Sequence, residues 1–186
     1  MRHADHSKPP PTDVIELIEP RVDLEASHRS FVEEFHAMGE ELVPWVIGEP
    51  YADFNEYVAR LLGAAVGIGL RPGWVAHSTC WLIDGDGEIV AISNVRHALT
   101  DYLLNWGGHI GYGVRPSKRR MGYGTEVLRQ SLLRAGALGL RKVRLTCNKD
   151  NVASQRTILR NGGEFDGEAF MPEQQCVACR YWISLP

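Results

Sequence analysis

A basic, glycine-rich segment between a predicted strand and a predicted helix constrains this chain more than any other feature. The strand ends at Val114, and the segment occupies residues 115–125. Beyond it, Leu128, Leu132 and Ala135 recur at the spacing of one face of a helix. The sequence therefore predicts a strand–loop–helix unit inside an α/β fold.

The loop has the chemistry of a pyrophosphate site. Gly122 and Gly124 lack a Cβ, so the backbone can approach a ligand closely. The first turn of the following helix has unpaired N–H groups and a partial positive charge, and both favour a phosphate. Four basic side chains are predicted to add positive charge at the same place: Arg115, Lys118, Arg119 and Arg120.

Two common nucleotide loops are excluded by the spacing. A P-loop contains Gly-Lys followed by Ser or Thr, and the chain has no Gly-Lys pair. A dinucleotide fingerprint needs a third glycine where Val127 stands. The pattern that remains is Arg119-x-x-Gly122-x-Gly124. On this motif alone, a glycine-rich turn that merely opens a helix stays an alternative.

A second pattern follows the loop. Residues 142–148 alternate as a strand, Asn151 and Ser154 have the spacing of a helix start, and Gly162-Gly163 closes the segment. Together with the loop, this order resembles the GNAT N-acetyltransferase superfamily over roughly residues 75–170. Shorter stretches resemble a largely uncharacterised bacterial subgroup: Arg96-His97, residues 107–112, 115–117 and 145–148.

The resemblance implies a particular fold. We expect residues 14–186 to form a single GNAT-like α/β domain, with a mixed, mostly antiparallel central sheet and helices on both faces. Two parallel strands, at 108–114 and 142–148, would splay apart at the cofactor site. Residues 1–13 hold three consecutive prolines and no apolar stretch, which predicts a disordered N-terminal arm.

The resemblance also implies acetyl-CoA as co-substrate and assigns the residues that would hold it. The N–H of Val114 would polarise the thioester carbonyl, the loop amides would bind the pyrophosphate, and Asn151 and Ser154 would contact the pantetheine arm. The last two also suit an ordinary helix N-cap. The implied cofactor-binding residues are Val114, Arg119, Arg120, Met121, Gly122, Tyr123, Gly124, Thr125, Asn151 and Ser154.

The implied reaction is direct attack of a primary amine, on a small molecule or peptide, on acetyl-CoA in a ternary complex. Two departures from the family pattern affect this mechanism. Ile158 stands where many members have a tyrosine acid, and the usual glutamate base is missing. His109 is the candidate catalytic base, since a neutral imidazole titrates near working pH. A structural role for His109, or water as the base, stays open. The alternative function is an acyl-CoA-binding module with little or no catalytic activity.

Charge is distributed unevenly and bears on the partners. Residues 31–60 hold seven acidic side chains and one basic, and residues 115–144 hold nine basic and one acidic. The family places the first segment over the acceptor side, where it would attract a cationic amine; a solvated helix face is the alternative. No aromatic stacking series accompanies the basic segment, so it suits coenzyme A and does not indicate a nucleic-acid partner.

The remaining signals concern cysteines and location. Cys176 and Cys179 have a redox or half-zinc spacing, which leaves a thiol redox protein as a third hypothesis. In a strand, however, their sulfurs would point to opposite faces, and no second pair completes a metal site. No apolar run spans a bilayer and no signal peptide is evident, so a cytoplasmic protein is expected. The resemblance also allows a homodimer.

Overall fold

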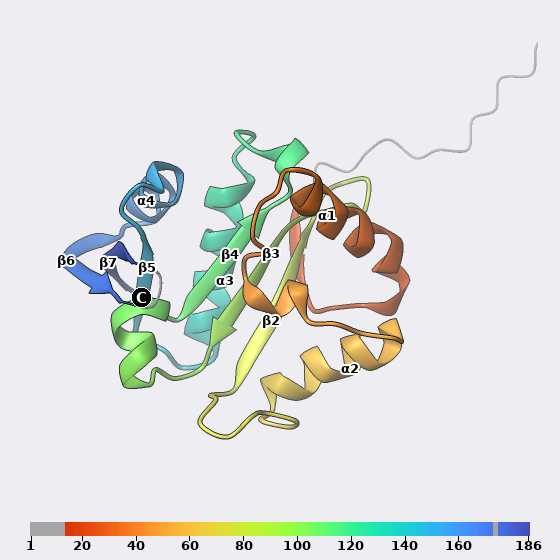
Figure 1. Ribbon diagram of the computed structural model, residues 1–186, viewed down its shortest axis with the longest axis horizontal. Coiled ribbons are helices and arrows are strands. Elements are labelled where there is room, and N and C mark those ends of the chain that lie inside the picture. Colours follow the sequence, from red (N-terminus) through yellow and green to blue (C-terminus); the bar gives the residue numbers. More distant parts are fainter. Residues whose placement is uncertain (1–13, 173–174) are drawn as a thin grey trace, which may run out of the picture.

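The computed structural model describes residues 14–172 and 175–186 and shows an α/β fold (Figure 1). The predicted N-terminal arm lies outside these residues. The strands are β1 (Glu16–Ile18), β2 (His77–Ile83), β3 (Ile89–Arg96), β4 (Ile110–Val114), β5 (Lys142–Asn148), β6 (Glu164–Met171) and β7 (Cys176–Ser184). The α-helices are α1 (Glu25–Ala37), α2 (Phe54–Ala65), α3 (Tyr123–Ala137) and α4 (Val152–Arg160). Short helical turns join them: η1 (Val22–Leu24), η2 (Trp45–Gly48), η3 (Leu103–Gly107) and η4 (Pro116–Lys118).

The strands form two sheets, ordered β1-β2-β3-β4 and β5-β7-β6. Every strand pairing in the described part of the chain is antiparallel. The mostly antiparallel α/β fold is therefore confirmed. The expected pair of splayed parallel strands is not observed, because β4 and β5 belong to different sheets and share no ladder.

The beginnings of β4 and β5 nevertheless touch. The N–H of His109 donates to the Arg144 carbonyl at 2.7 Å, and the N–H of Arg144 donates to His109 Nδ1 at 2.8 Å. Gly108 permits this approach, because it has a φ of 64° and a Cβ there would lie 2.7 Å from the Arg144 carbonyl oxygen. His109 Nδ1 thus accepts the hydrogen bond that a backbone carbonyl would accept in a regular ladder. Regular pairing between β4 and β5 therefore stops after one backbone hydrogen bond.

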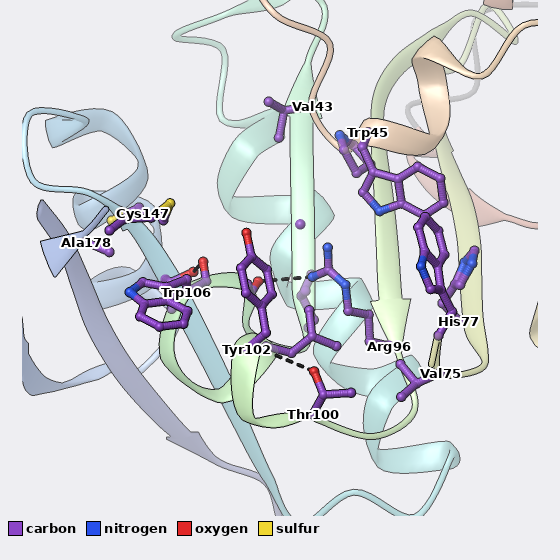
Figure 2. A pocket seen from close by; sticks show the side chains of 18 of the residues that line it. Val43, Trp45, Val75, His77, Arg96, Thr100, Tyr102, Trp106, Cys147 and Ala178 are labelled. Carbon is purple, nitrogen blue, oxygen red and sulfur yellow. Dashed lines mark hydrogen bonds between the residues drawn. The ribbon is translucent and has the colours of Figure 1, made fainter. Parts of the chain in front are cut away.

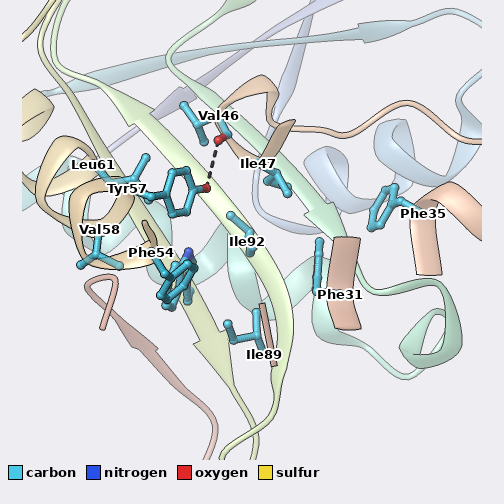
Figure 3. Packing of buried hydrophobic residues seen from close by; sticks show 11 residues of the cluster. Phe31, Phe35, Val46, Ile47, Phe54, Tyr57, Val58, Leu61, Ile89 and Ile92 are labelled. Atoms are coloured by element: carbon cyan, nitrogen blue, oxygen red, sulfur yellow. Dashed lines mark hydrogen bonds between the residues drawn. The ribbon is translucent and has the colours of Figure 1, made fainter. Parts of the chain in front are cut away.

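Helices cover both faces of the first sheet. Trp81 and Leu82 are consecutive on β2, so their side chains point to opposite faces. Trp81 packs under α1 and α2, which contribute aromatic residues such as Phe31 and Phe54 (Figure 3). Leu82 packs with Val127 of α3 on the other face. The predicted arrangement of helices is confirmed.

Candidate functional site

The loop that opens α3 presents backbone N–H groups without protein acceptors. Arg120 and Gly122 have φ angles of 64° and 92°, so the chain turns twice through the left-handed region. Within the described residues, no hydrogen bond uses the N–H groups of residues 120–124. The N–H groups of Thr125 and Glu126 both donate to the Gly122 carbonyl, at 3.0 and 3.1 Å. Unpaired amides at the start of a 15-residue helix form a site that favours an anion.

Two of the four basic side chains predicted at the loop have a different role. Arg115 is 1% exposed and lies 3.0 Å from the carboxylates of both Glu34 and Glu88. Lys118 pairs with Asp84 at 3.2 Å and with Glu88 at 2.7 Å. The prediction that these two residues add free positive charge at the loop is therefore wrong. They tie the loop to α1 and to the β2–β3 hairpin.

Arg119 is also engaged, whereas Arg120 is exposed. The Arg119 guanidinium donates to both carboxylate oxygens of Glu40, at 2.7 and 2.6 Å, and stacks 5.3 Å from the centre of the Phe35 ring. Its Nε donates to the Val114 carbonyl at 3.2 Å. Arg120 takes part in no ion pair among the described residues. The acidic segment therefore meets the basic loop, with Glu34 and Glu40 directed at arginines.

The N–H of Val114 points into the opening beside β5. Antiparallel ladders alternate, so every second residue of an edge strand directs its N–H away from its neighbour. Arg115 N donates to the Val90 carbonyl at 2.9 Å, and the Arg96 N–H donates to His109 at 2.7 Å. These odd-numbered positions of β4 face β3. Val114 therefore faces the other way, at the end of β4 next to the loop.

The beginning of α4 lies across the same opening. Asn151 caps the helix, because its Oδ1 accepts from the Ser154 N–H at 3.0 Å. The Ser154 hydroxyl lies 3.0 Å from the Tyr112 hydroxyl of β4. Burial raises the pKa of Tyr112 to about 12, so this phenol keeps its proton at neutral pH. Ile158 is fully buried in the core between α3, α4 and the second sheet.

A cavity of about 650 Å³ lies where β4 and β5 separate, lined by Gly111 on one strand and Thr146 to Asn148 on the other (Figure 2). Its walls are rich in aromatic side chains from distant segments: Trp45, Trp74, Tyr102 and Trp106. Trp45 packs edge-to-face on Trp74, with ring centroids 4.6 Å apart. Trp45 thus lines the cavity, whereas the nearby aromatic residues Tyr51 and Phe54 belong to the core under α2.

Sequence reasoning missed most of this cavity. Aromatic residues in segments without regular strand or helix periodicity, such as Trp74, have no pattern to reveal their direction. Helix η3 brings Trp106 to the cavity. All four aromatic residues therefore come from loops and short helical turns, outside the strands and the α-helices.

The cavity wall holds the basic side chains of Arg96 and His77 beside neutral polar ones such as Thr146 and Asn148. Arg96 Nη1 donates to the carbonyls of Gly107 and Gly108, both at 3.0 Å. His77 Nδ1 lies 2.9 Å from the side-chain amide nitrogen of Asn94, and burial lowers the pKa of His77 to about 4. No Asp or Glu is among the residues described as lining the cavity. The acidic residues of the 31–60 segment therefore do not form its rim.

His109 lies at the base of the opening and is 6% exposed. Its Nδ1 accepts from the Arg144 N–H, so that lone pair is already used. Burial, followed by the charge of Arg96, lowers the pKa of His109 to about 4. These contacts favour the structural one of the two roles that the sequence left open for this residue.

The cysteines and the helices bear on the other hypotheses. Cys176 and Cys179 both lie on β7, three residues apart, so the strand directs them to opposite faces. Residues 14–172 and 175–186 hold no group of three or more His, Cys, Asp or Glu that could bind a metal. In the same ranges, no helix combines the length and apolar character needed to cross a membrane.

Two antiparallel sheets, a loop of unpaired amides and a cavity along the same strand define the class of α/β proteins with an anion site beside a split sheet. Comparison with protein families supports this class, because the family described as acetyltransferase (GNAT) domain matches residues 15–164. The chain belongs to this family of acetyl-CoA-dependent N-acetyltransferases. A comparison with curated protein sequences finds no match.

Solved structures share the fold. One is the Salmonella typhimurium acetyltransferase that modifies the N-terminal serine of ribosomal protein L7/L12, with 16% identity, a TM-score of 0.65, and 95% of this chain and 98% of that chain covered. Mycobacterium smegmatis RimJ, in complex with a CoA-disulfide, has 19% identity, a TM-score of 0.66 and coverage of 94% and 83%. Vibrio cholerae spermidine N-acetyltransferase has 14% identity, a TM-score of 0.60 and coverage of 91% and 93%. At these identities the likeness establishes the fold alone.

Proposed function

We propose that the protein transfers the acetyl group of acetyl-CoA to a primary amine, on a small molecule or peptide, by direct attack in a ternary complex. The observation that carries this proposal is the position of the unpaired amides of residues 120–124, beside the Val114 end of β4. Amides of residues 120–124 would bind the pyrophosphate, Arg120 would add the exposed charge, and Asn151 and Ser154 would flank the pantetheine arm. The acceptor would enter from the aromatic cavity.

The Val114 N–H supplies the stabilisation of the transition state. It faces the opening, so it can donate to the thioester oxygen as negative charge develops there. One such backbone donor is worth about 3 kcal/mol in other acyl-transfer enzymes. Positioning of the amine next to the thioester supplies much of the remaining acceleration. The proton of the attacking amine passes to water, because the Nδ1 lone pair of His109 already accepts a hydrogen bond from the Arg144 N–H.

Tyr112 is our candidate for the acid that protonates the departing thiolate. Ile158 cannot serve, because it has no ionisable group and is buried in the core. The Tyr112 hydroxyl is the phenol next to Ser154, at 3.0 Å, and its raised pKa keeps it protonated. As the C–S bond breaks, the Tyr112 proton moves to sulfur, and solvent then returns a proton to the phenolate.

The Tyr112→Phe variant tests this assignment. We expect kcat to fall by about 10- to 100-fold, as for loss of other proton donors, while the Kd for acetyl-CoA changes little. The measurement is steady-state kinetics alongside calorimetric titration, with Tyr102→Phe as the matched control in the cavity wall. An unchanged kcat for Tyr112→Phe would remove this residue as the acid.

The alternative, an acyl-CoA-binding module, is favoured by one observation, which is the buried Ile158 at the usual acid position. Calorimetric titration with acetyl-CoA, with NADH as the control ligand, tests binding first. An amine screen followed by mass spectrometry then tests turnover. Micromolar binding with acetylated product supports the enzyme, binding without product on any amine supports the module, and no binding overturns both.

A further inference from the structure

We propose that the acceptor carries a carboxylate or similar anionic group remote from its reactive amine, and that Arg96 binds this group inside the aromatic cavity. This inference rests on the proposed acetyltransferase function and deepens it by naming the acceptor class. It replaces the cationic acceptor expected from the acidic segment. The observation that supports it is that the Arg96 guanidinium has unused hydrogen-bond donors and lies between aromatic side chains of the cavity wall.

Arg96 has donors to spare. Only Nη1 forms hydrogen bonds in the described part of the chain, to the carbonyls of Gly107 and Gly108. Figure 2 shows the guanidinium extending between Tyr102 and Trp45. The Nε and Nη2 donors are therefore available, and a guanidinium presents such donors in a fork that matches two carboxylate oxygens.

The charge around Arg96 lacks a counterion. No ion pair among residues 14–172 and 175–186 includes Arg96, and no Asp or Glu lines the cavity. His77 and His109 lie nearby, and burial lowers the pKa of each to about 4, so both imidazoles are neutral at neutral pH. Burial lowers the pKa of Arg96, because it disfavours the charged form. A charged group held in apolar surroundings without a partner is costly, and a ligand anion removes that cost.

Three other arginines of the molecule make a contrast. Arg115 and Arg119 each have carboxylate partners within 3.0 Å, and Arg144 pairs with Asp166. These side chains hold elements of the fold together. Arg96 also contacts the end of helix η3, through two carbonyls. Among the described residues, however, it has no carboxylate partner, so its charge can bind an anion in the cavity.

The position of Arg96 also sets the shape of the acceptor. Arg96 lies opposite His109 in the ladder, because its N–H donates to the His109 carbonyl. Val114 is five residues further along β4, which corresponds to about 16 Å at the rise of a strand. Even with the reach of the arginine side chain, the anion and the amine belong at opposite ends of an extended acceptor. An apolar or aromatic middle would pack against Trp45 and Trp106.

Two dipeptides test this class, namely glycyl-L-phenylalanine and its C-terminal amide. They differ in the anion alone and keep the same amine and ring. We expect the wild-type kcat/KM, measured from acetylated product at saturating acetyl-CoA, to favour the acid at least tenfold. Arg96→Gln should bring the ratio close to one, and Arg96→Lys should retain part of it. The control Arg71→Gln removes a charge that lies over Trp74 outside the cavity wall, and should leave the ratio unchanged.

The change in the ratio between wild type and Arg96→Gln is the deciding quantity, because differences in amine pKa between the two dipeptides cancel in it. An unchanged ratio in Arg96→Gln overturns the proposal. So does a wild-type enzyme that uses both dipeptides equally. Loss of acetyl-CoA binding in the wild type would instead contradict the proposed function itself, so the two failures are distinguishable.

A second measurement needs neither turnover nor a variant. Trp45, Trp74 and Trp106 line the cavity, so their fluorescence reports its occupancy. We titrate the wild-type protein with 3-phenylpropanoate and with 3-phenylpropanamide, which lack the amine. Saturable quenching by the acid at tenfold lower concentration supports the proposal, whereas equal quenching by the two compounds, or none, overturns it.

Discussion

The loop that opens α3 and the aromatic cavity flank the same strand, β4, yet they would recognise their ligands by different means. The loop offers N–H groups from consecutive residues, 120–124, whose side chains are largely exposed or engaged elsewhere. The cavity offers side chains drawn from between Val43 and Ala178. A backbone site depends on the path of the chain, and a side-chain site depends on residue identity. Substitutions that change the path of the backbone should therefore impair the loop, whereas substitutions that change a side chain should impair the cavity.

The largest effect should come from a basic residue that the sequence predicted to add positive charge at the loop. Arg115→Met removes the buried partner of Glu34 and Glu88, and we expect a loss of about 3–5 kcal/mol in the free energy of unfolding. Denaturant unfolding measures this, and Arg120→Met, at the exposed position, should change stability by less than about 0.5 kcal/mol. If Arg115→Met kept its stability but lost acetyl-CoA binding, the division between backbone and side chains would be wrong.

The next effect concerns the path of the loop. Gly122 has a φ of 92° and no atom within 4 Å of a Cβ, so Gly122→Val meets a conformational conflict and no collision. We expect acetyl-CoA affinity to fall by about 100-fold, because the amides lose their alignment. Gly139, with a φ of 88° at the other end of the same helix, gives the matched control. Gly139→Val should be strained equally and bind normally. Calorimetric binding that survives Gly122→Val would disprove the loop assignment.

A smaller effect should appear with pH at the base of the cavity. The pKa of His109 is lowered to about 4 in the folded protein and lies near 6.5 in the unfolded chain. As pH falls, the unfolded chain takes up the proton first. The free energy of unfolding therefore decreases as pH falls from 6.5 toward 4. For His109 the loss between pH 7 and pH 5 is about 2 kcal/mol.

The His109→Asn variant isolates this contribution. Asn offers an oxygen where Nδ1 accepts from the Arg144 N–H, but it does not titrate. We measure the free energy of unfolding in urea at pH 7 and at pH 5. The difference between the two values should be about 2 kcal/mol smaller in the variant than in the wild type. The rate of acetyl transfer at pH 7 to 8 should be retained. A lost rate would instead restore His109 as the catalytic base.

The smallest effect should come from one aromatic wall of the cavity. Trp45→Ala removes the ring that packs on Trp74 and His77, and we expect the acceptor KM to rise about tenfold. The Kd for acetyl-CoA should stay constant, since the loop is untouched. Trp182→Ala, beside Lys142 and outside the cavity, is the control. An altered acetyl-CoA Kd in Trp45→Ala would show that loop and cavity are not independent.

Much of the fold follows from local sequence. The strand at Lys142–Asn148 agrees with the predicted range, and Asn151 caps α4 where a helix start was expected. These elements have regular alternation or a clear cap, so neighbouring residues decide them. The loop motif belongs to the same category, because glycines at fixed spacing act on the backbone directly.

What only the tertiary structure decided is which charged and aromatic groups meet. The sequence determined the loop, the helix that follows it and the family resemblance. It did not determine that Arg115 is buried against Glu34, that Arg96 is left without a carboxylate, or that Trp45 and Trp106 share a cavity. Backbone conformation depends on a few adjacent residues, whereas these contacts join segments separated by 60 to 80 positions. Their partners are fixed only when the two sheets and their helices pack together.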